Sequence, residues 1–153
     1  MSGDFVKRGG IWVVTQITLM LINSAAPLWH REEPSLPVIL CSALLFAVAA
    51  VCGILGAIAL GRNLTPFPHP SSGTRLVTRG IYGLIRHPLY SAVMLWSLGW
   101  AVLWLSWPAF VAALLLMPLL DAKSRKEERW LLLRFPEYGT YQNRTRRFLP
   151  WIY

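Results

Sequence analysis

Three long stretches of this sequence contain no Asp, Glu, Lys or Arg, and they limit the possible folds more than any other feature. They are residues 9–29, 36–60 and 89–120, with lengths of 21, 25 and 32 residues. A helix needs about 20 residues to cross the roughly 30 Å hydrocarbon core of a bilayer. Because backbone polar groups find no water there, such crossing segments must be helical. We therefore predict an all-α fold, an integral membrane helical bundle.

The lengths of the stretches predict the number of helices. The first two suffice for one transmembrane helix each, at residues 9–29 and 36–60. The third would cover roughly 48 Å as a helix, which is short of the roughly 60 Å that two full crossings need. Pro108 lies near its middle and suits the first turn of a new helix. We predict a hairpin of two short membrane helices at residues 88–121, and so about four transmembrane helices in a single membrane domain, residues 1–153.

The composition agrees with a membrane protein, since 55% of the residues are hydrophobic and eight are Trp. Lys7 and Arg8 precede the first apolar stretch, as in a signal peptide, but its length and the later spans favour a retained helix. Cys41 and Cys52 fall on the same face of one predicted helix, about three turns apart. That separation excludes a disulfide between them, so we expect ordinary packing.

The formal net charge is +8, which in a soluble protein would indicate a nucleic-acid partner. Here 14 of the 15 Lys and Arg residues precede the first span, lie between the second and third, or follow the last. Four spans place these segments on one side, which the positive-inside rule makes cytoplasmic. We therefore expect membrane lipids and no nucleic acid as partners. Both termini would be cytoplasmic, at the inner membrane if the protein is bacterial, and only Arg31 falls on the other side.

The predicted cytoplasmic loop, residues 61–87, leads into the third apolar stretch. Its first part has three prolines in five residues, which forbid regular helix. Pro88 suits the first turn of the next helix, and that helix places Tyr90 beside His87. Together with Arg86, these side chains would cluster at the membrane surface and could hold a polar ligand. They could equally serve as a lipid-phosphate contact, a belt aromatic and a helix cap.

The segment after the last span, residues 122–153, is predicted to be a cytoplasmic helix followed by a tail. Residues 121–135 contain no helix breaker, and we interpret them as one cytoplasmic helix. Glu127 and Glu128 would point about 100° apart around it. One can face inward while the other pairs with Arg125 or Arg129, although a salt-bridged surface would also explain them. The residues from 136 onward, rich in aromatics and Arg, should form a lid or clamp on the membrane surface.

These two segments together resemble the isoprenylcysteine carboxyl methyltransferase and phospholipid methyltransferase superfamily of integral membrane enzymes. The resemblance covers roughly residues 74–150. The first element consists of Leu76-Val77-Thr78, Gly80-Ile81-Tyr82 and Arg86-His87-Pro88-Leu89-Tyr90. The second consists of Glu127-Glu128, Leu131, Phe135, Glu137-Tyr138, Tyr141, Arg147 and Pro150. Either element alone is a weak indication, whereas both in this order are fairly specific.

The resemblance implies that S-adenosylmethionine is the cofactor, bound on the cytoplasmic side. The cofactor-binding residues it implies are Thr74, Arg75, Leu76, Val77, Tyr82, His87, Pro88, Leu89, Tyr90 and Glu127. Catalytic roles would fall to Glu128, Arg86 and Arg125, and substrate binding to Lys123 and Arg125. Lys123 stands where isoprenylcysteine enzymes place a substrate-binding Arg, and a Lys cannot offer a carboxylate a bidentate fork. Ala92 stands where the first element often has Gly.

The resemblance predicts methyl transfer from S-adenosylmethionine to a lipophilic substrate at the cytoplasmic interface. The acceptor could be a prenylcysteine-like carboxylate, a phospholipid amine or another small lipophile. A carboxylate needs no general base, whereas an amine or hydroxyl would need one, and Glu128 or His87 could serve. The oligomeric state is left open.

Two alternatives remain, an NADPH-dependent sterol-type membrane reductase and a small membrane scaffold without enzymatic activity. The chain is short for such a reductase and has no second nucleotide-binding segment. The predicted spans carry no ionisable residue, which disfavours an ion pathway. We expect no metal site, because His30, His69 and His87 do not fall at ligand spacing with Cys or carboxylates.

Overall fold

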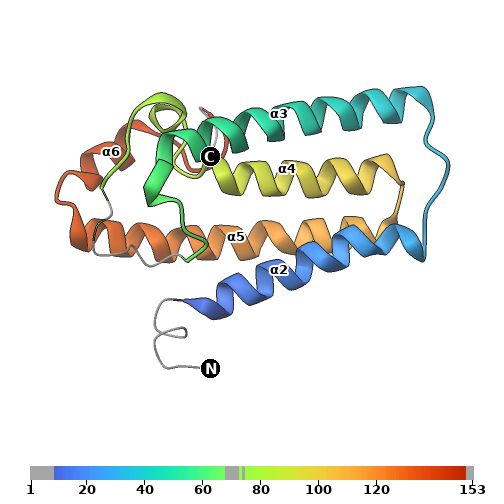
Figure 1. The fold of residues 1–153 in the computed structure, drawn as a ribbon, viewed down its shortest axis with the longest axis horizontal. Helices are drawn as coiled ribbons and strands as arrows, with labels where there is room; N and C mark the ends of the chain where they lie inside the picture. The colour runs from blue at the N-terminus through green and yellow to red at the C-terminus, as the bar shows by residue number, and fades with distance from the viewer. Residues whose placement is uncertain (1–8, 68–72, 74, 151–153) are drawn as a thin grey trace.

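A computed structural model describes residues 9–67, 73 and 75–150 of the chain (Figure 1). The α-helices are α2 (Gly10–Ala25), α3 (Leu36–Leu60), α4 (Pro88–Leu103), α5 (Trp107–Arg134) and α6 (Tyr138–Arg144). Single 3-10 turns cover Ala26–Leu28, Gly61–Asn63 and Gly80–Gly83. Within the described residues the only β-pairing is an isolated bridge between Ile85 and Arg146. The prediction of an all-helical fold is confirmed.

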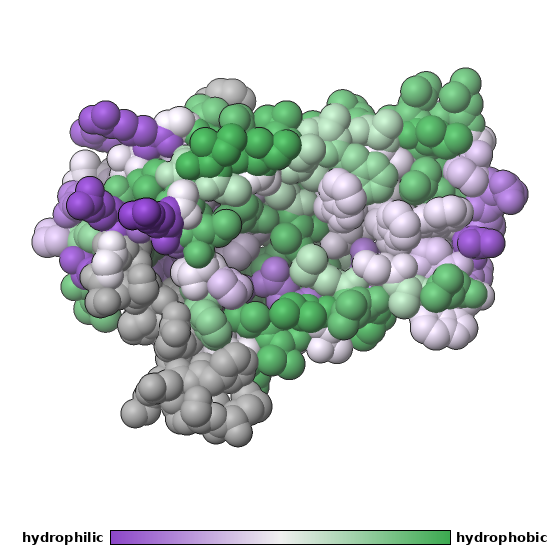
Figure 2. Space-filling model, in the orientation of Figure 1, coloured by the Kyte–Doolittle hydropathy of each residue, from purple (hydrophilic) through white to green (hydrophobic). Residues whose placement is uncertain are grey.

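The four long helices run roughly along the long axis of the molecule, with α3 beside α4 and α2 crossing α5 (Figure 1). Hydrophobic side chains cover most of the middle of the visible surface, whereas the most hydrophilic ones gather toward its two ends (Figure 2). Three helical segments are long and apolar enough to cross a bilayer, Gly10–Leu28, Leu36–Asn63 and Trp107–Arg134. Helix α4 is shorter, with 16 residues. The chain is therefore a helical bundle of the membrane type.

Helix α5 differs from the prediction. We expected a short membrane helix up to residue 121 and a separate cytoplasmic helix after it, but a single helix of 28 residues, Trp107–Arg134, passes through that boundary. Nothing breaks the helix where apolar residues give way to charged ones, and Pro118 is accommodated within it. The ionisable side chains from residue 121 onward thus lie on the same continuous helix as the apolar residues before them. Lys123, two residues beyond the predicted hairpin, is 2% exposed.

The ends of the helices follow local sequence signals. Helices α3, α4 and α5 each carry a proline in the first turn, where its missing N–H costs nothing. The predicted bend before Pro108 is confirmed, since α4 ends at Leu103 and α5 begins at Trp107. Leu105 adopts the left-handed conformation there, with φ of 47°. The amide of Ser106 then donates to the carbonyl of Ala101 at 3.2 Å and closes the turn.

One buried amide connects helix α2 to its two neighbours. Asn23 is 2% exposed, and its Nδ2 donates to the carbonyl of Ser97 in α4 at 3.2 Å and to that of Ala109 in α5 at 2.9 Å. Side-chain hydrogen bonds between helices hold membrane bundles together where apolar packing alone is not selective. Asn23 therefore fixes the position of α2 against the α4–α5 hairpin.

We predict that replacing Gly99 by Ala destabilises the bundle, because α3 and α4 approach closely there. A Cβ at Gly99 would lie 3.0 Å from a ring carbon of Phe46 and 3.2 Å from Cβ of Leu45. The matched control is Gly53→Ala in α3, whose Cβ would meet that of Ala92 at an ordinary 3.5 Å. Helix propensity favours Ala at both sites by about 1 kcal/mol, whereas overpacking costs about 1–3 kcal/mol. Unfolding by SDS titration in detergent should show Gly99→Ala less stable than Gly53→Ala, and equal stabilities would contradict the close approach.

Candidate cofactor and active site

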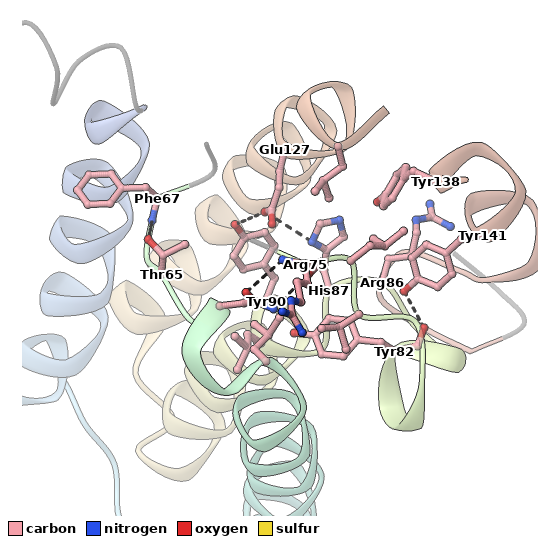
Figure 3. A pocket seen from close by; sticks show the side chains of 16 residues that line it. Thr65, Phe67, Arg75, Tyr82, Arg86, His87, Tyr90, Glu127, Tyr138 and Tyr141 are labelled. Carbon is pink, nitrogen blue, oxygen red and sulfur yellow. Dashed lines mark hydrogen bonds and ion pairs between the residues drawn. The ribbon is translucent and has the colours of Figure 1, made fainter. Parts of the chain in front are cut away.

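A pocket opens at the end of the bundle where α3 ends and α4 begins (Figure 3). Its walls come from the last residues of α3, the loop after it, the first turn of α4, the charged part of α5 and α6. The lining residues are Leu60, Asn63, Thr65, Phe67, Arg75, Leu76, Val77, Tyr82, Arg86, His87, Leu89, Tyr90, Glu127, Leu131, Tyr138 and Tyr141. The two segments that the sequence analysis singled out therefore meet around one cavity.

Three polar side chains form one wall of this pocket (Figure 3). The Tyr90 hydroxyl donates to Glu127 Oε2 at 2.8 Å. The His87 ring stacks parallel to the Tyr90 ring with 5.2 Å between centroids, which confirms the prediction that Tyr90 lies beside His87. Nδ1 of His87 lies 3.8 Å from Glu127 Oε2. The Glu127 side chain keeps 28% of its surface exposed, so it can reach a ligand in the pocket.

Glu128 points away from the pocket into a buried polar cluster and is 3% exposed. Its Oε1 accepts from Arg86 Nε at 2.7 Å, His87 Nε2 at 3.1 Å and Arg147 Nε at 3.4 Å. Its Oε2 accepts from Arg147 and from Gln142, both at 3.0 Å. The prediction that one of the two Glu residues faces inward is met by Glu128, whereas the predicted pairing of the other with Arg125 or Arg129 stays a prediction. The partners of Glu128 come from segments 14 to 42 residues distant, which helix periodicity does not reveal.

The segment 145–148, which we call the C-terminal strap, holds the backbone of the pocket wall in place. The amides of Arg86 and His87 donate to the carbonyls of Arg146 and Arg147 at 2.8 and 3.0 Å. Ser91 Oγ donates to the carbonyl of Phe148 at 2.9 Å. Arg147 also reaches Asp121 at 2.8 Å. The strap therefore positions His87 through its backbone and, by way of Arg147 and Glu128, through its side chain.

Three tyrosines cover the remaining wall of the pocket. Burial raises the pKa of Tyr82, Tyr138 and Tyr141, and the negative charge of Glu127 or Glu128 raises the first two further. The Tyr141 hydroxyl donates to the carbonyl of Tyr82 at 2.7 Å. These phenols consequently stay neutral at physiological pH. Neutral aromatic faces beside one accessible carboxylate suit a cationic ligand.

The structure places most of the predicted cofactor residues on this pocket. Those that line it are Arg75, Leu76, Val77, Tyr82, His87, Leu89, Tyr90 and Glu127. Pro88 is buried behind the wall, where its ring faces Gly56 of α3, and Thr74 lies outside the described residues. The pocket residues that the sequence analysis did not assign are Leu60, Asn63, Thr65, Phe67, Leu131, Tyr138 and Tyr141. Leu131, which the sequence analysis named in the second element without a role, lies one helical turn after Glu127 and could have been assigned to the site from that spacing.

Two predicted substrate-binding residues are separated by the structure. Lys123 lies against α2, where its Nζ donates to Gln16 Oε1 at 2.6 Å and sits 5.1 Å from the centroid of the Tyr90 ring. Arg125 projects outward with 52% of its side chain exposed and pairs with Asp121 at 2.7 Å. Neither lines the pocket. Positions two apart on a helix point in nearly opposite directions, and the substrate-binding roles of both residues stay predictions.

The structure also bears on metals and disulfides. Within the described residues no group of three or more His, Cys, Asp or Glu side chains could hold a metal ion. Cys41 and Cys52 are both free, as the spacing predicted.

The fold is that of a helical membrane bundle with a pocket at one end. The chain belongs to the phospholipid methyltransferase family, which it matches over residues 38–137. It is 30% identical over 102 residues to a probable protein-S-isoprenylcysteine O-methyltransferase of Oryza sativa, covering 64% of this chain and 53% of that protein. The superfamily resemblance seen in the sequence is confirmed.

Two bacterial proteins are also similar. The cobalt-zinc-cadmium resistance protein CzcN of Cupriavidus metallidurans is 41% identical over 76 residues, which is 49% of this chain and 35% of that protein. The nickel-cobalt-cadmium resistance protein NccN of Alcaligenes xylosoxydans xylosoxydans is 30% identical over 146 residues, which is 94% of this chain and 64% of that protein. The chain thus spans about a third to two thirds of the length of these relatives.

Proposed function

We propose that this protein transfers a methyl group from S-adenosylmethionine to a lipophilic acceptor at the cytoplasmic face of a membrane. Membership in the phospholipid methyltransferase family supports the reaction class. The observation that carries the cofactor assignment is the Glu127 carboxylate, oriented by the Tyr90 hydroxyl at 2.8 Å in a pocket lined by tyrosines. A carboxylate among aromatic faces favours a small organic cation, and the methyl donor is a sulfonium.

The residues present fit this cofactor, which would supply the electrophilic methyl group. Glu127 would face its positive charge or a ribose hydroxyl, and Arg75 could receive its carboxylate. The apolar side chains of Leu76, Val77 and Leu89 offer a surface for a flat aromatic base. Holding donor and acceptor at near-attack distance can supply about 7 to 11 kcal/mol of the barrier reduction. The chain therefore needs no further chemical group to act on an ionised acceptor.

The charge distribution supports the proposed orientation. Arg75 and Arg86 line the pocket, which lies next to the turn that contains Arg62, the basic part of α5 and the strap. The positive-inside rule makes this end cytoplasmic, where S-adenosylmethionine is made. Under this orientation residues 61–87 form a cytoplasmic cofactor loop, and the chain beyond the apolar part of α5 forms the cytoplasmic helix and tail. A lipophilic acceptor would enter from the bilayer.

We predict that the purified protein binds S-adenosylhomocysteine and does not bind NADPH. Isothermal titration calorimetry in detergent measures both directly, and it separates the methyltransferase from the reductase alternative. Arg31→Gln is the matched control, because Arg31 packs over Trp104 near the α4–α5 turn and should leave binding unchanged. Binding of NADPH without S-adenosylhomocysteine would favour the reductase. Binding of neither by folded protein would favour the scaffold.

A further inference from the structure

The His87 ring lies between two carboxylates that differ in their surroundings. Its Nε2 is 3.1 Å from Glu128 Oε1, and its Nδ1 is 3.8 Å from Glu127 Oε2. Arg86 and Arg147 both hold Glu128 in an ion pair, so this carboxylate is ionised and can only accept hydrogen bonds. The hydrogen in the contact between His87 and Glu128 must therefore be on Nε2. A neutral His87 then carries its lone pair on Nδ1.

Nδ1 faces the pocket. The close-up view shows a His87 ring nitrogen directed toward Glu127, which itself lines the cavity (Figure 3). The separation of 3.8 Å from Glu127 exceeds hydrogen-bond distance, and no described side chain donates to Nδ1. The ring is held by stacking on Tyr90 and by the Phe148 ring of the strap. His87 thus presents a fixed proton acceptor to whatever occupies the pocket.

We propose that His87 is the general base of the methyl transfer and that Glu128 is the residue that positions it, an inference that rests on the proposed function. The acceptor nucleophile uses its lone pair to form the bond to the methyl carbon. The carbon–sulfur bond breaks, and its electron pair stays on sulfur, which becomes neutral. The proton of the nucleophile passes to Nδ1 of His87. The resulting imidazolium lies between Glu127 and Glu128, so its charge is compensated on both sides.

The oxygens of the two carboxylates already accept hydrogen bonds in this arrangement, whereas no described side chain donates to Nδ1 of His87. Glu128 already accepts five hydrogen bonds, two guanidinium groups among their donors. Glu127 accepts from Tyr90 and would face the cationic donor, so its oxygens are already engaged. A built-in base is useful only for a nucleophile that must lose a proton. The acceptor is therefore an amine or hydroxyl of a lipophile, since a carboxylate would have no use for it.

The first test is the tautomer of His87, which does not depend on activity. The chain contains three histidines, so ¹⁵N-histidine labelling gives a spectrum that His87→Asn and His30→Asn can assign. We expect the neutral His87 ring to carry its hydrogen on Nε2. The charged groups that face it are Glu127 and Glu128 from α5, the neighbouring Arg86, and Arg147 from the strap, with the Tyr90 phenol on its face. A hydrogen on Nδ1 in the neutral ring would overturn the proposal.

The second test measures transfer from radiolabelled S-adenosylmethionine to phosphatidylethanolamine in vesicles and, separately, to N-acetyl-S-farnesylcysteine. We expect methyl transfer to the amine of phosphatidylethanolamine. In His87→Asn we expect kcat for transfer to the amine to fall by about 100-fold or more. Undiminished transfer to phosphatidylethanolamine by His87→Asn overturns the proposal. Transfer to N-acetyl-S-farnesylcysteine at equal rates by the unmodified protein and by His87→Asn also overturns it. A failure of the unmodified protein to bind S-adenosylhomocysteine would instead refute the proposed function.

Discussion

Replacing Glu128 with alanine is expected to lower the free energy of unfolding by about 3–5 kcal/mol and to release the C-terminal strap. The side chain is 3% exposed, and the Arg86 and Arg147 side chains that pair with it are 8% and 14% exposed. Removing the carboxylate leaves Arg86 without a carboxylate partner among the described residues and leaves Arg147 with Asp121 alone. Arg86 would keep its contacts with the carbonyls of Gln142 and Thr145, which cannot neutralise it.

The neighbouring Glu127→Ala is the matched control for this experiment. Glu127 lies on the same helix, but its side chain is 28% exposed and accepts one hydrogen bond, from Tyr90. Its loss should cost about 1 kcal/mol. SDS-titration unfolding in detergent gives the two free energies, and limited proteolysis reports whether the strap has detached. Equal decreases in the free energy of unfolding would show that Glu128 contributes no more to stability than Glu127.

Replacing Glu127 with glutamine is expected to weaken binding of S-adenosylmethionine by about 10- to 100-fold, because a hydrogen-bonded or ion-paired charge contributes about 1.5–3 kcal/mol. Glutamine keeps the size of the side chain and can still accept from Tyr90. The substitution therefore removes the charge with little change in shape. S-adenosylhomocysteine lacks the sulfonium charge, so its affinity should fall less.

Calorimetry with both ligands separates the possible contacts of Glu127. A larger loss for S-adenosylmethionine places the carboxylate near the sulfonium, whereas equal losses place it near the amino group or ribose that both ligands share. Arg31→Gln near the opposite end of the bundle should bind both ligands as the unmodified protein does. Unchanged affinities in Glu127→Gln would mean that this carboxylate does not contact the cofactor.

The sequence alone was enough for the features that depend on local patterns. Uncharged stretches of 21 to 32 residues require membrane helices, because the bilayer leaves a chain few other ways to satisfy its backbone. Pro88 and Pro108 marked two helix starts, because proline fits a first turn and disrupts an interior. The contact of His87 with Tyr90 followed from a spacing of three residues on a helix. These relations involve neighbours along the chain, and the resemblance to a family added the order of the two motifs.

The tertiary structure decided which of two similar residues does what. Glu127 and Glu128 are equivalent by composition, but only Glu128 meets Arg86, 42 residues earlier in the chain, and Arg147 in the strap. Lys123 and Arg125 were both predicted to bind substrate, but Lys123 contacts Gln16 of α2 whereas Arg125 remains half exposed. The physical reason is the same in both cases. Helix periodicity fixes the angle between two side chains. The packing of distant segments determines which side chain faces the core, the pocket or water.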